Sequence, residues 1–291
     1  QADAWSAAEG GGMTDSAQWT RVDDGRFQVD LLTADYRRHA FTRHSHSTFA
    51  IGVVVCGVEQ FHYRGSLHRA GVGSLAILEP DEPHDGQAAA PAGWAYRVFY
   101  PPADLLFEAA PRAHFGTAVV HDPRTVHLVR SAHESLTSGL DAFAAHSKLT
   151  WALSAVVHRH GSPAADASDL PAPPARDPAA VRKVAEIRDR LTADLRCAPT
   201  LRELAAGVEL SPFHMLRVFR EATGFPPHTW LVLERVCRAR HLLAAGLTPA
   251  QVASGVGFAD QAHLTRWFKR VTGVTPAAFR NSVQDPGRRR A

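Results

Sequence analysis

The stretch "SPFHMLRVFREATGFPP", residues 211–227, returns in altered form as "DQAHLTRWFKRVTGVTP", residues 260–276. The two copies begin 49 residues apart and align without gaps. They share a histidine, an arginine, a phenylalanine, a Thr-Gly pair and a proline at equal positions. A pattern repeated in this way predicts two copies of one structural unit.

Each copy has the features of an amphipathic helix. Ser211 and Asp260 are good N-cap residues, and Gly224 and Gly273 suit the left-handed position that follows a helix. Apolar residues at spacings of three and four predict a buried stripe on each helix. The stripes are Met215, Val218, Phe219 and Ala222 in the first copy, and Leu264, Trp267, Phe268 and Val271 in the second.

A shorter helix is predicted before each copy, in "TLRELAAGVEL" (200–210) and "TPAQVASGVGF" (248–258). Thr200 followed by Glu203 is a capping box. A helix, a tight glycine-containing turn and a second helix with a polar outer face form a helix-turn-helix unit, so the chain carries two.

Between the units, "PHTWLVLERVCRARHLLAAG" predicts a helix from Pro227. About 19 residues at 1.5 Å each make it roughly 28 Å long, close to the roughly 34 Å of one DNA turn. We therefore predict that a single chain inserts two recognition helices, about 211–223 and 260–272, into successive major grooves.

Residues 181–281 resemble the DNA-binding domain of the AraC/XylS family of bacterial transcription regulators. The resemblance rests on the stretch "ASGVGFADQAHLTRWFKRVTGVTPAAFR", which is very close to that family's signature. The resemblance implies a cytoplasmic regulator, not an enzyme, that binds a double-stranded DNA operator and acts with RNA polymerase.

Arg217 and Arg266 lie in the second turn of their helices, where they are placed to pair with guanine. Leu216 stands where a polar reading residue is common, which weakens the expected readout by the first helix. Arg220, Lys269 and Arg270 are better placed for phosphates, and a merely solvated role remains open for each basic side chain. The candidate DNA-binding residues are Phe213, His214, Leu216, Arg217 and Arg220, with Gln261, Ala262, His263, Thr265, Arg266, Lys269 and Arg270.

Charge is divided unevenly along the chain. Residues 179–291 hold 18 Lys/Arg against 9 Asp/Glu, about +9, whereas residues 1–178 hold 14 against 20, about −6. A basic C-terminal third favours a polyanionic partner, although a solvated basic surface explains charge alone equally well.

Residues 26–100 alternate in hydrophobicity and turn often, as in "FAIGVVV" and "WAYRVFY", which predicts an all-β sandwich or barrel. Residues 121–160 switch to helical spacing. Their apolar stripe either packs on the barrel or pairs with a second subunit, and both alternatives stay open. The stripe comprises Val126, Val129, His133, Leu136, Leu140 and Phe143.

Residues 26–102 resemble the small cupin barrel that many AraC-type regulators use to bind an effector. In metal cupins an HxH pair, a glutamate and a later histidine share one ion. Here His44, His46 and His84 match, but Ala50 and Ile51 stand where the glutamate would fall. Three imidazoles suit zinc or a similar divalent metal, and the alternative is a metal-free pocket for an organic effector. The candidate effector-binding residues are His44, His46, His62, Tyr63, His84, Trp94 and Tyr96, with Arg97 also considered.

The predicted fold class is α+β multidomain: a small cupin-like β-barrel with a helical hairpin, then an all-α domain of two helix-turn-helix units joined by a long helix. The alternative function is a cupin-type metal-dependent enzyme fused to a DNA-binding domain. No apolar run is long enough to span a membrane, and the three cysteines form no CxxC pair. The predicted segments are a disordered leader (1–18), the effector-binding domain (19–120), a hairpin that is a possible homodimerisation element (121–160), a Pro/Ala-rich linker (161–178), the DNA-binding domain (179–282) and a basic tail (283–291).

Overall fold

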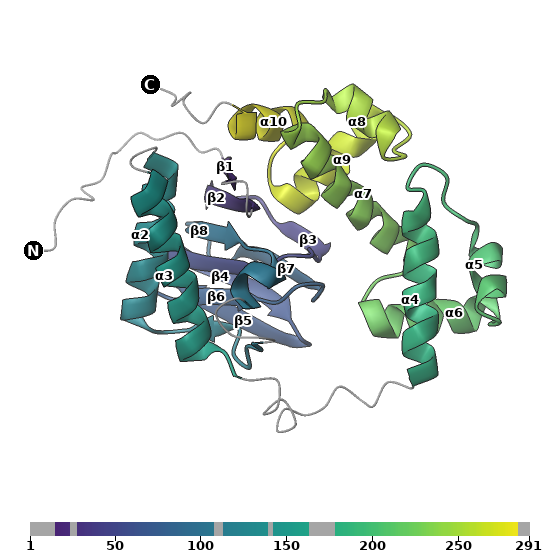
Figure 1. Ribbon diagram of the computed structural model, residues 1–291, viewed down its shortest axis with the longest axis horizontal. Coiled ribbons are helices and arrows are strands. Elements are labelled where there is room, and N and C mark those ends of the chain that lie inside the picture. Colours follow the sequence, from purple (N-terminus) through teal and green to yellow (C-terminus); the bar gives the residue numbers. More distant parts are fainter. Residues whose placement is uncertain (1–14, 24–27, 108–112, 139–141, 163–177, 285–291) are drawn as a thin grey trace, which may run out of the picture.

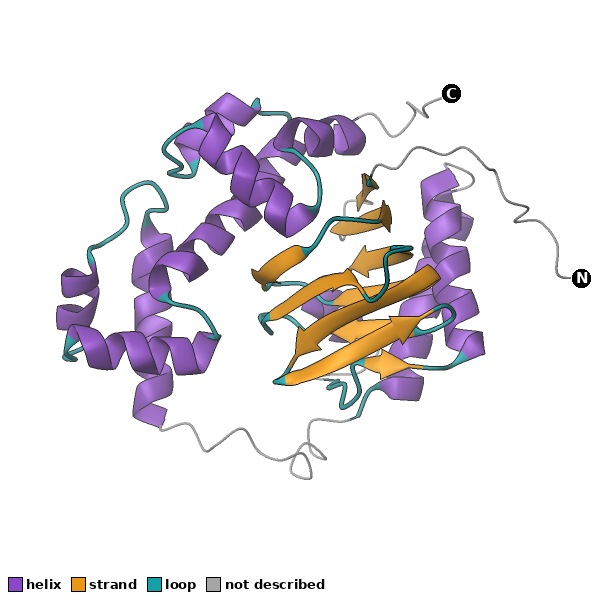
Figure 2. Ribbon diagram, turned by 180° about the vertical axis from the view of Figure 1, so that it is seen from behind, coloured by secondary structure: helices purple, strands orange, loops and turns teal. Residues whose placement is uncertain are grey.

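The structure, a computed structural model, describes residues 15–23, 28–107, 113–138, 142–162 and 178–284. A strand-rich N-terminal domain is followed by a helical domain, which confirms the predicted fold class (Figure 1). Figure 2 shows the sheet between two helical layers: a pair of helices on one side and the helical domain on the other. Within the described residues no helix is long and apolar enough to cross a membrane.

In the described part of the N-terminal domain nine strands form one sheet, in the order β1-β2-β8-β4-β6-β9, with β7 joining β3 to β4 and β5 pairing with β4. All pairs are antiparallel. The strands are β1 (Ser16–Asp23), β2 (Gln28–Tyr36), β3 (Phe41–His44), β4 (Ala50–Tyr63), β5 (Ser66–Gly71), β6 (Leu75–Leu78), β7 (His84–Ala88), β8 (Trp94–Tyr100) and β9 (Val119–Val120).

The long strand β4 closes the barrel because it belongs to both of its faces. Residues 51–57 pair with β8, whereas residues 58–63 pair with β5. The register shifts between Val54 and Cys56, and Gly57 has φ +67°. A Cβ on Gly57 would lie 2.1 Å from the carbonyl oxygen of Gly93. Glycine is therefore required where the strand bends from one face to the other.

Three helices cover the outer face of the sheet: α1 (Ala103–Phe107), α2 (Pro123–Ser138) and α3 (Ala142–His160). Alternate residues of the strands, such as Ile51 and Val53, pack against α2 and α3, while their neighbours face the barrel interior. Val129 and His133 of the predicted apolar stripe are buried in this layer. Within residues 123–138 the stripe therefore packs on the chain's own sheet. The structure does not describe the side chains of Leu140 and Phe143.

The predicted segment ends differ from the structure at both termini. Strand β1 starts at Ser16, so the prediction of a leader reaching residue 18 is wrong for residues 16–18, whose backbones pair with β2. Its earlier part, residues 1–14, lies outside the described residues. At the other end the last helix continues to Gln284 because Val283 packs on the core, so the predicted tail loses its first two residues. Most of the predicted linker, residues 163–177, also lies outside the described residues, and Pro178 already belongs to a helix.

Every element of residues 178–284 is a helix. Thr200 and Glu203 form the predicted capping box, and the side chains of Ser211 and Asp260 cap the two recognition helices. Gly224 and Gly273 adopt the left-handed conformation at the helix ends, with φ of +75° and +78°. The helices are α4 (Pro178–Ala193), α5 (Leu201–Gly207), α6 (Pro212–Thr223), α7 (Pro227–Ala244), α8 (Pro249–Gly255), α9 (Gln261–Thr272) and α10 (Pro276–Gln284).

The two helix-turn-helix units have separate cores joined by α7. The first unit packs with α4 and the beginning of α7, around Met215 and Phe219. The second unit packs with the rest of α7, around Leu264 and Phe268, and its core is continuous with the barrel interior. The barrel and the second unit therefore form one apolar body.

Candidate DNA-binding face and ligand cavity

Helices α6 and α9 present matching polar faces to solvent. Their buried sides carry Met215 and Phe219 in α6, and Leu264 and Phe268 in α9. Most of the predicted reading and phosphate residues lie on the opposite side. Those exposed are Phe213, His214, Arg217, Arg220, Gln261, Ala262, Arg266, Lys269 and Arg270, while Leu216, His263 and Thr265 are half-buried.

Several of these side chains have contacts that bear on their predicted roles. Phe213 is 87% exposed, more than any other large apolar residue in the described part of the chain. The Thr265 hydroxyl donates to the Gln261 carbonyl at 2.8 Å, so its hydrogen is already used within α9. The His263 ring packs edge-on against Phe258, with centroids 5.2 Å apart, and the Arg270 guanidinium lies over Trp267.

The three histidines of the cupin-like pattern meet in a cavity inside the barrel. The ring centroids of His44 and His84 are 4.4 Å apart, those of His46 and His84 are 4.8 Å apart, and those of His44 and His46 are 6.1 Å apart. The cavity volume is about 50 Å³. Its lining is Phe41, His44, His46, Ala50, Gly52, Glu59, Ala76, Leu78, His84, Asp85, Tyr96, Val98 and Tyr100.

Backbone carbonyls fix the orientation of all three rings. Nδ1 of His44 lies 2.8 Å from the Thr42 carbonyl oxygen, Nδ1 of His46 lies 2.7 Å from that of Thr48, and Nδ1 of His84 lies 2.9 Å from that of Glu82. Because a carbonyl only accepts, each Nδ1 carries the hydrogen and each Nε2 keeps a lone pair. Burial lowers the pKa of His44 to about 3 and that of His84 to about 4, so the rings are neutral at pH 7.

A carboxyl group reaches the cavity from a position that the sequence pattern did not indicate. Glu59, on the second half of β4, lines the cavity, and burial raises its pKa to about 8. A protonated Glu59 both donates and accepts hydrogen bonds. Two tyrosines, Tyr96 and Tyr100, add hydroxyl groups to the same lining.

Three predicted effector residues lie elsewhere. His62 is exposed and pairs with Asp85 at 2.9 Å, because side chains alternate along β4 and its own points outward. The Tyr63 hydroxyl accepts a hydrogen bond from the Glu79 amide, and Trp94 is buried against Tyr36. None of the three, nor Arg97, lines the cavity. Phe41, Glu59, Asp85 and Tyr100 were missed. The alternation of β8 is the signal that could have placed Tyr100, whereas the direction of Glu59 depends on the register shift and bend of β4 at Gly57.

The structure does not confirm the metal prediction. Among the described residues, no group of three or more His, Cys, Asp or Glu is arranged to hold a metal ion. The predicted histidines are together, but their geometry is that of rings lining a pocket.

The cavity wall continues into the contact between the two domains. Tyr100 stacks on Trp19, with ring centroids 5.1 Å apart, and Arg240 of α7 lies over both rings. Arg240 also pairs with Asp30 of β2 at 2.5 Å. Burial alone would raise the pKa of Asp30, but Arg240 and Arg21 outweigh burial and hold that pKa below its ordinary value. A buried charge pair therefore joins the barrel to α7.

The barrel also touches the same position of both helix-turn-helix units. A Cβ on Gly224, which ends α6, would lie 2.5 Å from the Pro83 ring. A Cβ on Gly273, which ends α9, would lie 2.0 Å from the Tyr36 hydroxyl. Pro83 precedes His84 of the cavity. Each recognition helix thus ends against the barrel and begins on the side away from it (Figure 1).

Comparison with known proteins adds independent findings. Residues 26–153 match the sequence profile of the AraC-like ligand binding domain, and residues 204–282 match that of a helix-turn-helix domain. The HTH-type transcriptional regulator RipA of Corynebacterium glutamicum is 37% identical over 110 residues, 38% of this chain and 32% of RipA. The match with this curated relative thus spans about a third of RipA's length.

Two further proteins match over most of the chain. The uncharacterized HTH-type transcriptional regulator YbfI of Bacillus subtilis is 24% identical over 231 residues, 77% of this chain and 81% of YbfI. The crystal structure of ToxT from Vibrio cholerae O395 covers 92% of this chain and 98% of its own, with a TM-score of 0.55 and 11% identity. At that identity the likeness to ToxT concerns the fold.

Proposed function

Because the chain belongs to the AraC/XylS family of transcriptional regulators, with an effector-binding domain and a helix-turn-helix DNA-binding domain, we propose that α6 and α9 enter successive major grooves of one operator. The observation that supports this proposal is that both recognition helices expose the same face. In both units the apolar side of the recognition helix is buried and the side with Arg217 or Arg266 is open to solvent. Helix α7, 18 residues or about 27 Å long, is a connector of suitable length.

The operator can be selected from a pool of random duplexes, and footprinting then tests whether protection covers two major grooves on one face. Arg266→Ala should cost about 1–3 kcal/mol on the selected site and relax specificity at one base pair, because a bidentate arginine–guanine pair is lost. Arg130→Ala, on α2 of the barrel domain, makes the same change of charge far from α9 and should leave binding unchanged. Protection of a single groove, or equal affinity of Arg266→Ala, would contradict the proposal.

For the effector we propose a small, uncharged molecule rich in hydroxyl groups. Three Nε2 lone pairs accept hydrogen bonds from such a ligand, while Glu59, Tyr96 and Tyr100 both donate and accept. At about 50 Å³ the cavity is smaller than the roughly 300 Å³ of a typical ligand pocket. Entry of the ligand therefore has to widen the barrel, and the Tyr100–Trp19–Arg240 stack carries that movement to α7.

A thermal-shift screen of sugars and polyols tests the effector class. A ligand should raise the melting temperature of the full chain, and His84→Ala should lose that response because one acceptor disappears. His121→Ala removes an exposed histidine outside the cavity and should keep the response. A response that survives His84→Ala would place the effector elsewhere.

A divalent metal is the second candidate for the cavity. The observation in its favour is that all three histidines hold Nδ1 on a carbonyl and leave Nε2 free, as metal-ligating histidines do. Elemental analysis of the purified full chain separates the two candidates. About one metal ion per chain, lost in both His44→Ala and His84→Ala, would favour the metal over the organic ligand.

Contacts with RNA polymerase and with a second copy of the chain belong to the same proposal. The described part of the hairpin stripe packs against the sheet, with Val129 and His133 buried and Val126 and Leu136 half-buried, so a homodimer would use other surfaces. Trp151 of α3, 67% exposed, is the large apolar side chain available there. Sedimentation of the full chain and of Trp151→Ser tests whether it mediates self-association.

A further inference from the structure

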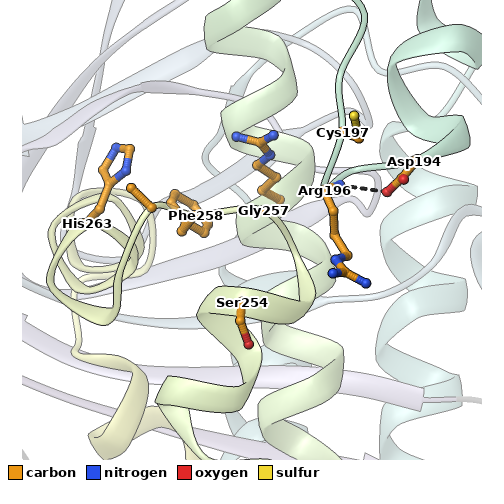
Figure 3. A pocket seen from close by; sticks show the side chains of 9 residues that line it. Asp194, Arg196, Cys197, Ser254, Gly257, Phe258 and His263 are labelled. Atoms are coloured by element: carbon orange, nitrogen blue, oxygen red, sulfur yellow. Dashed lines mark hydrogen bonds between the residues drawn. The ribbon is translucent and has the colours of Figure 1, made fainter.

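An open groove of about 740 Å³ runs between the two helix-turn-helix units (Figure 3). One wall is the loop from α4 to α5, the floor is α7, and the other wall is the turn from α8 to α9. We call it the inter-unit groove. It is lined by Asp194, Arg196, Cys197, Arg235, Ser254, Gly257, Phe258, Ala259 and His263.

Arg235 of α7 is a half-buried cation in the inter-unit groove. Its Nε donates to the Leu195 carbonyl at 2.9 Å. Of the ion pairs found among the described residues, none involves Arg235. Burial lowers its pKa and no neighbouring charge offsets the effect. One terminal nitrogen of its guanidinium lies 3.0 Å from where a Cβ on Gly257 would stand, so the glycine leaves room for that end of the side chain.

Together with Arg235, the other charged groups of the groove give it a net positive charge. Arg196 is exposed and its side chain lies among the lining groups in Figure 3. The one carboxylate of the lining, Asp194, accepts a hydrogen bond from the backbone amide of Arg196 at 2.8 Å. Two guanidinium groups and one carboxylate leave the groove positive, and the ring of His263 adds an N–H donor.

The groove opens on the side where DNA is proposed to bind. His263 belongs both to the groove lining and to the predicted reading row of α9. Both recognition helices begin on the side away from the barrel, and the groove lies next to the start of α9. When α6 and α9 occupy successive major grooves, the sugar-phosphate strands between those grooves must cross the gap between the units.

We propose that the inter-unit groove binds a backbone phosphate of the DNA segment that lies between the two major grooves, through Arg235 and Arg196. This inference rests on the proposed DNA binding and adds a contact outside both recognition helices. A guanidinium already held by a carbonyl at Nε presents its terminal nitrogens in a fixed orientation, which suits a phosphate. Such a contact positions the protein and is independent of base sequence.

The test is the salt dependence of binding to a fluorescent duplex of mixed sequence, about four turns or roughly 40 bp long. Each phosphate contact contributes about 0.9 to the slope of log K against log salt concentration. Arg196→Ala and Arg235→Gln should each reduce the slope by about that amount. Arg238→Ala, an exposed arginine of α7 outside the groove, is the matched control and should keep the full slope.

If Arg235 has only a structural role, Arg235→Gln will lower the melting temperature and leave the salt slope of the folded protein unchanged. If Arg235→Gln does not fold, the salt slope of Arg196→Ala, a change at an exposed position, still tests the inference. A duplex with methylphosphonates between the two protected grooves should weaken DNA binding by the wild type, and should weaken DNA binding by Arg196→Ala less, because only Arg235 remains to contact the phosphate. Unchanged slopes in both variants would overturn the inference, whereas absence of any salt-dependent binding by the wild type would overturn the proposed function itself.

Discussion

His133 is a buried histidine in an apolar layer. The free-energy cost of burying it should depend on pH. It is 1% exposed and packs edge-on against Phe99. Burial, with a smaller effect from Arg97, lowers its pKa to about 3. Between that value and the ordinary pKa of 6.5, the unfolded chain holds a proton that the folded chain does not. Stability therefore falls as pH falls through this window, by about 1.4 kcal/mol per pH unit.

His133→Leu should remove this loss. Between pH 6.5 and pH 5 the wild type should lose about 2 kcal/mol more than the variant, measured by urea unfolding. Other buried histidines titrate in both proteins and cancel in the difference. His127→Leu, an exposed position on the same helix, should keep the wild-type dependence. Equal dependence on pH in wild type and His133→Leu would mean that His133 is protonated in the folded state.

At the same scale, spacing predicted some cavity residues and missed others. His44, His46 and His84 meet because an HxH pair and a strand end are local features that face one way. Glu59 could not be found from the HxH pattern, because it depends on how β4 bends at Gly57. His62 and Tyr63 were assigned from residue type, and their direction is set by the register of β4 with β5 and β7.

The turn of the second helix-turn-helix unit shows how a single glycine sets an element boundary. Gly257 has φ +83°, and a Cβ there would lie 2.3 Å from the Leu195 carbonyl oxygen. Gly257→Ala should lower the unfolding free energy by more than about 1 kcal/mol, since both the conformation and the space are lost. Gly255→Ala, at the end of α8 with open space around it, should be neutral or stabilising by up to about 1 kcal/mol. Urea unfolding of both variants checks the contrast.

Helices of the C-terminal domain were the most predictable elements. Caps such as Ser211 and Asp260 and the glycines after the recognition helices act within one turn of chain, so sequence alone specifies them. Strand β1 was missed because its inward Trp19 gains its burial from α10 and β8, which are remote in sequence. Elements whose stability comes from distant partners have no local signature.

At the scale of the whole molecule, the docking of the two domains was not predictable from sequence. Asp30 and Arg240 are 210 residues apart, and neither stands in a recognisable motif. The contact is nevertheless extensive: the barrel interior and the second unit share one apolar core, and Trp19 donates from its indole nitrogen to the Thr272 carbonyl at 3.2 Å. Cavity and DNA-binding units are thus parts of one packed body.

Removal of Arg240 should loosen this body. Arg240→Met leaves Asp30 with Arg21 as its only cationic partner and removes the cation over Trp19. Loss of one partner of a buried ion pair costs roughly 3–5 kcal/mol of stability. Because Arg21 still pairs with Asp30, we expect a cost near the lower end of that range. The radius of gyration from small-angle scattering should rise, and calorimetry should resolve two transitions. Arg238→Met, exposed on the same helix, should match the wild type in both measurements. If Arg240→Met stays as compact as the wild type with a single transition, the apolar core alone holds the domains together, and the charge pair has no part in passing the state of the cavity to α7.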